Sequence, residues 1–134
     1  MKNKYGVSQK ICIAISWTLT VALMVTIFCL SSQVSSKSSG LSSGVISRIT
    51  ELFHITLTQH TVRKTAHALE YAALCFLFSC SWQSLFLKSQ HTLSFLSAAL
   101  YASSDELHQY FVSGRACQPR DVLVDCLGAS FGLL

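Results

Sequence analysis

Four long apolar segments follow one another along the chain, separated by polar connections. The first, "ICIAISWTLTVALMVTIFCL", covers residues 11–30 and carries no charged side chain. At a rise of about 1.5 Å per residue, a helix of this length reaches about 30 Å, the thickness of the hydrocarbon core of a bilayer. Further segments cover about 66–87, 92–112 and 121–134. The pattern predicts an all-α integral membrane protein in which about four transmembrane helices form a bundle.

The first and last segments each leave an alternative open. Segment 11–30 could be the apolar core of a cleaved signal peptide, but such cores run for only about 7–15 residues. We therefore expect an uncleaved anchor. Segment 121–134 would reach about 21 Å as a helix, which is short of a full span. Such a helix stops partway across the bilayer, tilts into a thinned bilayer, or belongs to a chain that is truncated at residue 134.

The connection between the first two segments contains a weaker helical signal. Residues 31–44 are rich in serine, which predicts an extended stretch, and five apolar residues within 45–53 then recur at helical spacing. This pattern predicts a short amphipathic helix. Such a helix lies on the membrane surface or packs against the bundle, and the sequence favours neither alternative.

Composition supports a membrane protein rather than a soluble one. Hydrophobic residues make up 51% of the chain and charged residues 12%, whereas soluble domains carry about a quarter charged residues. The net charge of +4 is small and the basic residues are scattered, which argues against a nucleic-acid partner.

The single proline and the absence of repeats indicate one domain over residues 1–134. The six cysteines form no C-x-x-C pair, so neither a zinc ribbon nor a redox motif is predicted.

Basic residues give a prediction for orientation. Lys2, Lys4 and Lys10 precede the first segment, and positive charge there favours a cytoplasmic N-terminus. Lys88, in the short turn after the second segment, agrees with this orientation. Six other lysines and arginines, at positions from 37 to 120, would then lie outside. The charge rule is therefore obeyed only in part.

The ionisable residues near segment ends gather at one end of the predicted bundle. In an antiparallel bundle, the end of the first segment, the start of the second, the end of the third and the start of the fourth share one side. Several of these residues recur at helical spacing, so each helix presents a polar stripe. We predict a polar cup between the helices, formed by Gln33, Arg63, Lys64, His67, Glu70, Tyr71, Asp105, Glu106, Gln109, Arg115, Arg120, Asp121 and Asp125.

The polar cup can be interpreted structurally or functionally. In the structural interpretation, it is a network of ion pairs that sets the register of the helices, with arginines as the expected partners of Asp105 and Gln109. In the functional one, Arg63, Arg115 and Arg120 bind a polar or anionic headgroup, because guanidinium makes bidentate contacts to phosphate and carboxylate. Ionisable groups inside a membrane are costly and usually functional, which favours the second interpretation.

Helical geometry refines two further positions. Glu106 points about 100° away from Asp105 around the helix, so we expect it to face a different neighbour, the loop that bears Arg115. Gly128 and Gly132 are four residues apart on the last segment. Small residues at this spacing allow a helix to approach its neighbour closely.

Catalysis and metal binding are alternatives with less support. His67 and His108 could act as acid or base near carboxylates, but the chain contains no nucleophile elbow or other catalytic signature. Ligand-type residues stand one turn apart at 67/70 and 105/108, as in carboxylate metal sites of helical bundles. The neighbouring arginines would repel a cation. We therefore predict no metal and no cofactor, and keep an intramembrane enzyme as an alternative.

Four stretches resemble the VanZ-like family of bacterial membrane proteins: "SSQ" (31–33), "RKTAHALEYAAL" (63–74), "SSDELHQYFVSGR" (103–115) and "RDVLVDCLGASFG" (120–132). They contain R-K-x-x-H-x-x-x-Y, D-E-x-x-Q-x-x-x-x-x-R and D-x-x-x-[ND]-x-x-G-x-x-x-G in that order. The resemblance implies a multi-pass protein of the bacterial plasma membrane. The family takes its name from an accessory protein of glycopeptide-resistance clusters that is linked to low-level teicoplanin resistance, and no reaction is established for it.

Together, the residues and the resemblance predict a function. We expect an outward-facing polar cup that binds the headgroup of a lipid or a cell-wall precursor and contributes to resistance against teicoplanin or other glycopeptides. The expected partners are membrane lipids and a lipid-linked cell-wall precursor or a glycopeptide. An enzyme acting on a lipid-linked envelope substrate, and a purely structural or interaction module, remain the alternatives. The sequence does not indicate an oligomeric state.

Overall fold

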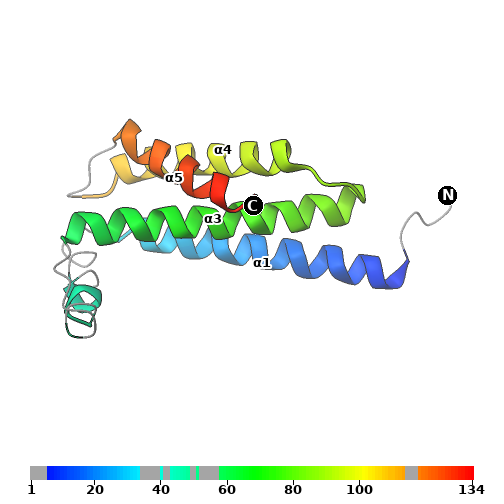
Figure 1. The fold of residues 1–134 in the computed structure, drawn as a ribbon, viewed down its shortest axis with the longest axis horizontal. Coiled ribbons are helices and arrows are strands. Elements are labelled where there is room, and N and C mark those ends of the chain that lie inside the picture. Colours follow the sequence, from blue (N-terminus) through cyan, green and yellow to red (C-terminus); the bar gives the residue numbers. More distant parts are fainter. Residues whose placement is uncertain (1–5, 34–39, 41–42, 49–50, 52–57, 114–117) are drawn as a thin grey trace.

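The computed structural model shows a bundle of four long helices (Figure 1). They are α1 (Val7–Ser31), α3 (Gln59–Phe86), α4 (His91–Tyr110) and α5 (Pro119–Phe131). The structure describes residues 6–33, 40, 43–48, 51, 58–113 and 118–134. Within these ranges all regular secondary structure is helical, so the all-α prediction is confirmed for this part of the chain.

Helix α3 begins earlier than the apolar pattern predicts. Its 28 residues start at Gln59 rather than near residue 66, and Thr58 caps it by accepting a hydrogen bond from the backbone N–H of Thr61. A threonine cap satisfies one of the free N–H groups of the first turn and stabilises a helix start that is otherwise polar. At about 42 Å, α3 is longer than a bilayer core is thick. Its polar first turns therefore extend the helix beyond its apolar part.

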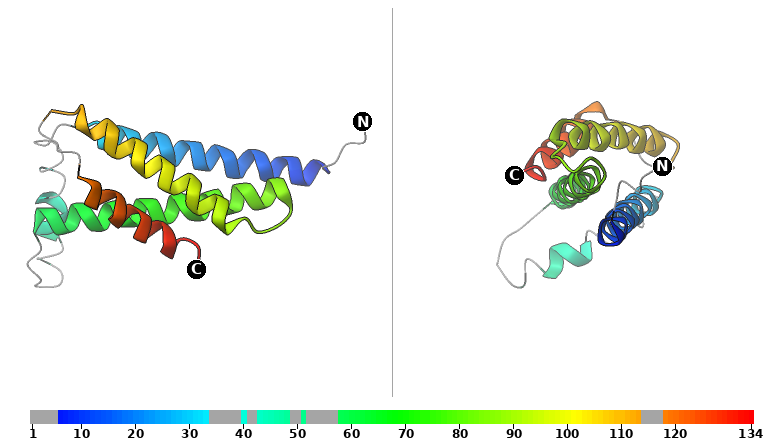
Figure 2. Two further views of the ribbon diagram at one scale, coloured as in Figure 1. Left: turned by 90° about the horizontal axis from the view of Figure 1, so that it is seen from above. Right: turned by 90° about the vertical axis from the view of Figure 1, so that its right-hand side faces the viewer.

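Helix α3 forms the centre of the bundle. It packs against α1, α4 and α5; α4 and α5 also pack against each other, whereas α1 and α4 have few contacts. Figures 1 and 2 show that the end of α1, the start of α3, the end of α4 and the start of α5 lie at the same end of the molecule. The turn between α3 and α4 lies at the opposite end, where Leu87 adopts a left-handed conformation with φ of 57°.

Two glycines determine how closely α5 approaches α3. A Cβ atom added to Gly128 would overlap the backbone carbonyl of Ala68, and one added to Gly132 would overlap that of Ala72. The glycines are four residues apart on α5 and the alanines four apart on α3, so the small residues of both helices face each other along one seam. Close backbone approach through small residues is a typical way for helices to associate in membranes.

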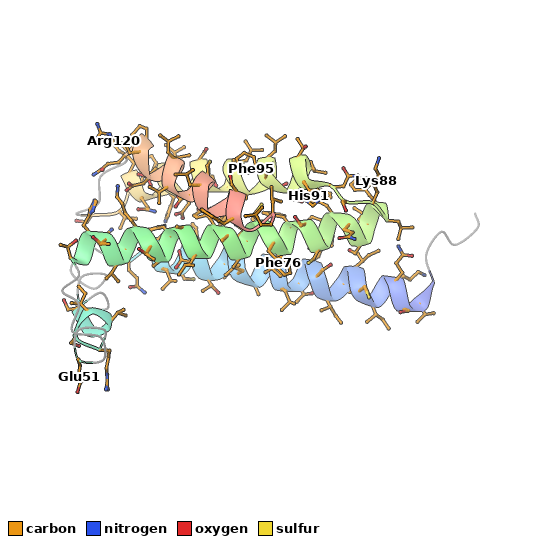
Figure 3. The ribbon with its side chains drawn as sticks, viewed as in Figure 1. Glu51, Phe76, Lys88, His91, Phe95 and Arg120 are labelled. Atoms are coloured by element: carbon orange, nitrogen blue, oxygen red, sulfur yellow. The ribbon has the colours of Figure 1, made fainter. Side chains whose placement is uncertain are left out.

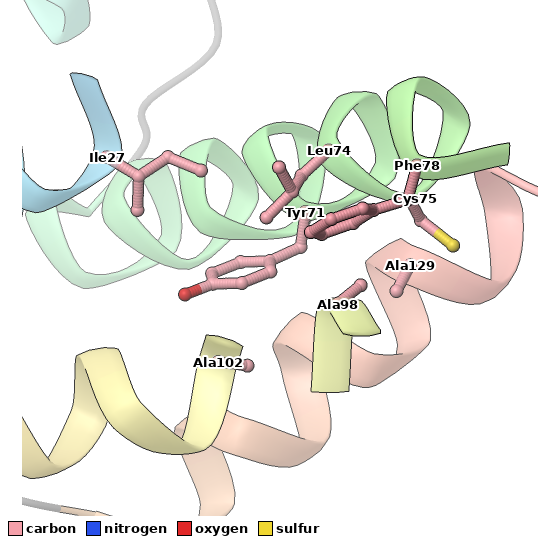
Figure 4. Close-up of a cluster of buried hydrophobic side chains, with 8 residues drawn as sticks. All are labelled: Ile27, Tyr71, Leu74, Cys75, Phe78, Ala98, Ala102 and Ala129. Carbon is pink, nitrogen blue, oxygen red and sulfur yellow. The ribbon is translucent and has the colours of Figure 1, made fainter. Parts of the chain in front are cut away.

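The apolar core is small and lies around the middle of α3 (Figure 4). Helix α3 supplies the large side chains, whereas α4 and α5 supply alanines, which lets these two helices come close to α3. The buried hydrophobic residues are Ile27, Tyr71, Leu74, Cys75, Phe78, Ala98, Ala102 and Ala129.

Large apolar side chains project outward from all four helices (Figure 3). On α4, Leu96 and Leu100 are exposed one turn apart, and on α5 Leu123, Leu127 and Phe131 form a stripe at i, i+4 and i+8. The buried positions, by contrast, include many polar residues. Monomeric soluble proteins rarely expose contiguous apolar surface of this kind.

The number of membrane spans is not decided by helix composition. In the described residues, α1 is the helix that is long and apolar enough to cross a membrane. One such helix near the N-terminus is weak evidence, because a signal sequence has the same properties. Helix α5 has 13 residues, in keeping with the short last segment of the sequence. The four-span bundle stays a prediction.

The predicted amphipathic helix is described only in part. Residues 43–48 are helical, with Val45 exposed and Ile46 half-buried. The remaining apolar positions of that pattern, at 49, 52 and 53, lie outside the described residues. Its location on a membrane surface stays a prediction.

Candidate functional site

Asp105 is the best-connected carboxylate at the polar end of the bundle. It lies near the end of α4 and is 3% exposed. Its Oδ2 accepts a hydrogen bond of 2.8 Å from the Ser31 hydroxyl and one of 2.9 Å from the side-chain amide of Gln109. The amide of Gln109 also lies 3.4 Å from the Ser31 oxygen. Because α1 and α4 have few other contacts, this group is a main link between them.

Within the described residues, Asp105 accepts hydrogen bonds from Ser31 and Gln109, and the expected pairing with arginines stays a prediction. Ser31, the last residue of α1, was missing from the predicted site, although it belongs to the "SSQ" stretch. Arg115 lies outside the described residues. Arg63 is half-buried and Arg120 exposed, and neither belongs to the ion pairs found within the described residues.

A second group joins α3 to α5. The Nδ1 atom of His67 lies 3.9 Å from a carboxylate oxygen of Glu70 and 3.9 Å from one of Asp125. Both distances exceed hydrogen-bond length, so the contacts are electrostatic and depend on a proton on His67. Asp125 is 2% exposed, whereas His67 and Glu70 are half-buried. The carboxylate of Asp125 is therefore the most enclosed member.

The rim of the polar end carries an ion pair between α3 and α5. The ammonium of Lys64 lies 3.0 Å from the carboxylate of Asp121, and their side chains are 30% and 34% exposed. Partly exposed ion pairs contribute about 1 kcal/mol or less to stability. The pair therefore orients the two helix starts rather than holding them together.

Glu106 faces away from Asp105, as its position on the helix predicts. It is 4% exposed, and its Oε1 accepts the backbone N–H of Gln118, which directly precedes Pro119 of α5. A carboxylate near the start of a helix is favoured by the helix dipole. Glu106 thus fixes the entry into α5. The expected contact with the loop that bears Arg115 lies outside the described residues.

Tyr71 brings a hydroxyl to the same region from the middle of α3. Its side chain is fully buried, and its hydroxyl oxygen has no hydrogen-bond partner within the described residues. The hydroxyl is close enough to Asp105 and Asp125 to interact electrostatically with both carboxylates. Figure 4 shows it directed away from Cys75 and Phe78. The Oδ1 atoms of Asp105 and Asp125 likewise accept no hydrogen bond in this part of the chain, and the Oδ1 of Asp125 is the atom that lies 3.9 Å from His67.

Two remaining residues lie at the edge of the site. Gln33 is half-buried just beyond the end of α1. His108, which the sequence offers as an acid or base, stacks on Phe28 with ring centroids 4.4 Å apart. Its Nε2 lies 3.1 Å from the Ser32 hydroxyl. His108 thus packs on the last turns of α1.

The buried chemistry of this end is acidic. Within the described residues, no three His, Cys, Asp or Glu side chains converge as a metal site requires. Three carboxylates are buried, while every described lysine, arginine and histidine is half-buried or exposed. Such a group can accept hydrogen bonds from a bound molecule, because it presents carboxylate and hydroxyl oxygens that are shielded from water.

The comparisons with known proteins give one match. No curated protein and no solved structure matches the chain. A family model described as VanZ/LLP1 matches residues 16–134, a range that contains most of α1, all of α3, α4 and α5, and every residue of the polar end. This agrees with the resemblance carried by the motifs at 63–74, 103–115 and 120–132. The chain is therefore a member of the VanZ/LLP1 family, the VanZ-like proteins.

Proposed function

We propose that this chain is a multi-pass protein of the bacterial plasma membrane whose polar end binds the headgroup of a lipid or of a cell-wall precursor. Through this binding it alters the sensitivity of the cell to teicoplanin and related glycopeptides. VanZ-like proteins are membrane proteins, and family membership supports a link with glycopeptide resistance.

The distribution of polar and apolar side chains supports several membrane spans. Leu100 is 72% exposed and Leu127 is 64% exposed, whereas Thr20 and Ser81 are fully buried and share a hydrogen bond of 2.9 Å between α1 and α3. In water such an exterior would cost about 25 cal/mol for each Å² of apolar surface. In lipid it costs little, and hydroxyl pairs between helices contribute to their association.

One observation carries the binding proposal. Asp105, Asp125 and Tyr71 come from three helices, are almost fully buried, and each has a polar oxygen without a hydrogen-bond partner in the described residues. More than about nine in ten buried polar groups have a partner in native structures. A bound headgroup would supply the missing hydrogen bonds. Its place at the end of the bundle corresponds to the depth of headgroups in a bilayer.

We infer the orientation from the positive charges near the start of α1. Lys10 precedes the apolar part of α1, and we expect it on the cytoplasmic side. Lys88 and His91, beside the turn between α3 and α4, lie toward one end of the molecule, and Arg120 lies at the other end (Figure 3). The polar end would then face outward, where a glycopeptide or a cell-wall precursor can reach it.

Drug sensitivity of a susceptible Gram-positive host tests this proposal. We expect the wild-type chain to raise the inhibitory concentration of teicoplanin more than that of vancomycin. The double variant Asp105→Asn and Asp125→Asn, which keeps the side-chain shape but removes both charges, should abolish the increase. Glu51→Gln makes the same chemical change at an exposed carboxylate and should leave it intact.

Protein abundance in the membrane must be measured in parallel. If the double variant is as abundant as the wild type and the resistance persists, the polar end does not carry the function. If only abundance falls, and the effect per molecule is unchanged, the buried polar residues act as structural contacts between helices.

A further inference from the structure

The charges buried at the polar end are all of one sign in the described residues. Asp105, Glu106 and Asp125 are 3%, 4% and 2% exposed. No described lysine, arginine or histidine is buried to a comparable degree. A buried charge is tolerated when an opposite charge or hydrogen-bond donors compensate it. The chemistry that compensates this group is therefore cationic or rich in donors.

Within the described residues, only some of the buried oxygens of this group accept a hydrogen bond. Glu106 accepts the backbone N–H of Gln118. One oxygen of Asp105 accepts two hydrogen bonds, from Ser31 and Gln109. The Oδ1 atoms of Asp105 and Asp125 and the hydroxyl oxygen of Tyr71 have no hydrogen-bond partner in the part of the chain that the structure describes.

Within the described residues, the nearby cations form no hydrogen bond with these oxygens. Lys64 is bound to Asp121 at the partly exposed rim. His67 lies between Glu70 and Asp125 at 3.9 Å from each, so even when protonated it offsets a single charge shared by two acids.

We propose that the headgroup bound here carries a protonated primary amine, held by the carboxylates of Asp105 and Asp125 and the hydroxyl of Tyr71. This inference rests on the headgroup binding proposed above. An ammonium group has three N–H donors and no acceptor, which matches three buried oxygens that lack a hydrogen bond in the described residues. A trimethylammonium group has the charge but no donor. A phosphate would be repelled, so the phosphate of such a headgroup lies outward, toward the rim that Lys64 occupies.

Lipid binding by the purified full chain tests this inference. The protein is placed in phosphatidylcholine nanodiscs that contain small amounts of phosphatidylethanolamine, its N-methyl and N,N-dimethyl forms, or phosphatidylglycerol. Lipid retained on the protein is measured by native mass spectrometry, and thermal stability is recorded for each composition. We expect phosphatidylethanolamine to be retained about tenfold or more over phosphatidylcholine and phosphatidylglycerol, because charge-assisted hydrogen bonds are lost in both. Retention should fall with each added methyl group.

Variants connect the selectivity to the three oxygens. Tyr71→Phe removes one oxygen without changing the shape of the ring, and Asp125→Asn removes one charge. Each should lower the preference for phosphatidylethanolamine about threefold or more. Glu51→Gln, at an exposed position, should leave the preference unchanged. If Asp125→Asn fails to fold, Tyr71→Phe alone still decides the role of this group, and an unchanged preference in it would overturn the assignment.

The outcomes separate this inference from the proposed function. Stronger retention of phosphatidylglycerol, or equal retention of all methylated forms, would refute the amine while leaving headgroup binding intact. If no lipid is retained over the phosphatidylcholine background, headgroup binding itself fails, and the buried carboxylates are compensated by protons or water. Free phosphoethanolamine, added to phosphatidylcholine discs, tests the soluble source. We expect it to stabilise the protein less than the lipid does, and the reverse result would overturn the assignment to a membrane lipid.

Discussion

Replacing Gly128 with alanine should push α5 away from α3. A Cβ atom at this position would lie closer than 3.0 Å to the carbonyl oxygen and carbon of Ala68. These are backbone atoms in the middle of a helix, so they cannot rotate aside as a flexible side chain would. The two helices must separate by about 1 Å or more to restore ordinary contact distances.

The expected cost follows from two opposing effects. Overpacking in a close interface destabilises a protein by about 1–3 kcal/mol. Alanine in place of glycine stabilises an α-helix by about 1 kcal/mol, which offsets part of this. We expect Gly128→Ala to lower the free energy of unfolding by about 1–2 kcal/mol, a change of about 5- to 30-fold in the ratio of folded to unfolded protein. Gly132→Ala should act in the same direction, because its Cβ would meet Ala72.

Two measurements check this prediction. Thermal unfolding in detergent or lipid discs gives the change in stability. Cys75 is fully buried on α3, so the rate at which its thiol is alkylated reports how tightly that helix is packed. Mass spectrometry of the peptide that contains Cys75 measures this rate. Gly44→Ala is the matched control, because a Cβ at Gly44 would meet nothing within 4 Å. The control should leave both readouts unchanged or slightly raise the melting temperature.

The reasoning is refuted if Gly128→Ala is as stable as Gly44→Ala and Cys75 stays equally protected. In that case α5 does not approach α3 at the distance that the structure shows. The placement of Asp125 beside His67, which depends on this approach, would also be wrong.

Other predictions concern contacts within the bundle. Ser31→Ala removes one of the donors to Asp105 and should lower the free energy of unfolding by about 1–3 kcal/mol, measured by denaturation; an effect below about 0.5 kcal/mol would contradict a buried hydrogen bond there. Thr20→Val removes a buried interhelical hydroxyl pair and should cost only about 0.6 kcal/mol in the same assay, the average for such bonds in membranes. Ser89→Cys and Ser113→Cys, at exposed positions on opposite ends of α4, should react with an impermeant maleimide from opposite faces of the membrane; reaction from the same face would rule out α4 as a span.

The helices and their order could be predicted from the sequence because both depend on local properties. An uncharged run such as residues 11–30 forms a helix regardless of its neighbours. The connection at 87–90 is short, so α3 and α4 must run antiparallel to each other. The boundaries were less predictable. Helix α3 extends to Gln59 because of a cap at Thr58, and a hydropathy pattern contains no information on such a cap.

Part of the polar site could also be anticipated. Helical spacing indicates that Asp105 and Gln109 share a face of α4, and they are joined by a hydrogen bond. The spacing of Gly128 and Gly132 indicates close approach to another helix. The sequence does not show that this helix is α3, because α5 could present its small residues to any neighbour.

The identity of the partners was decided only by the tertiary structure. The sequence does not single out Ser31, which is 74 residues away along the chain, as the hydrogen-bond donor to Asp105 from another helix. Tyr71 gains its place near two carboxylates in the same way. A sequence determines the period of each helix and therefore which residues share a face. Which of these faces meet depends on the rotation and axial shift of each helix, and these are set by the packing of all four helices together.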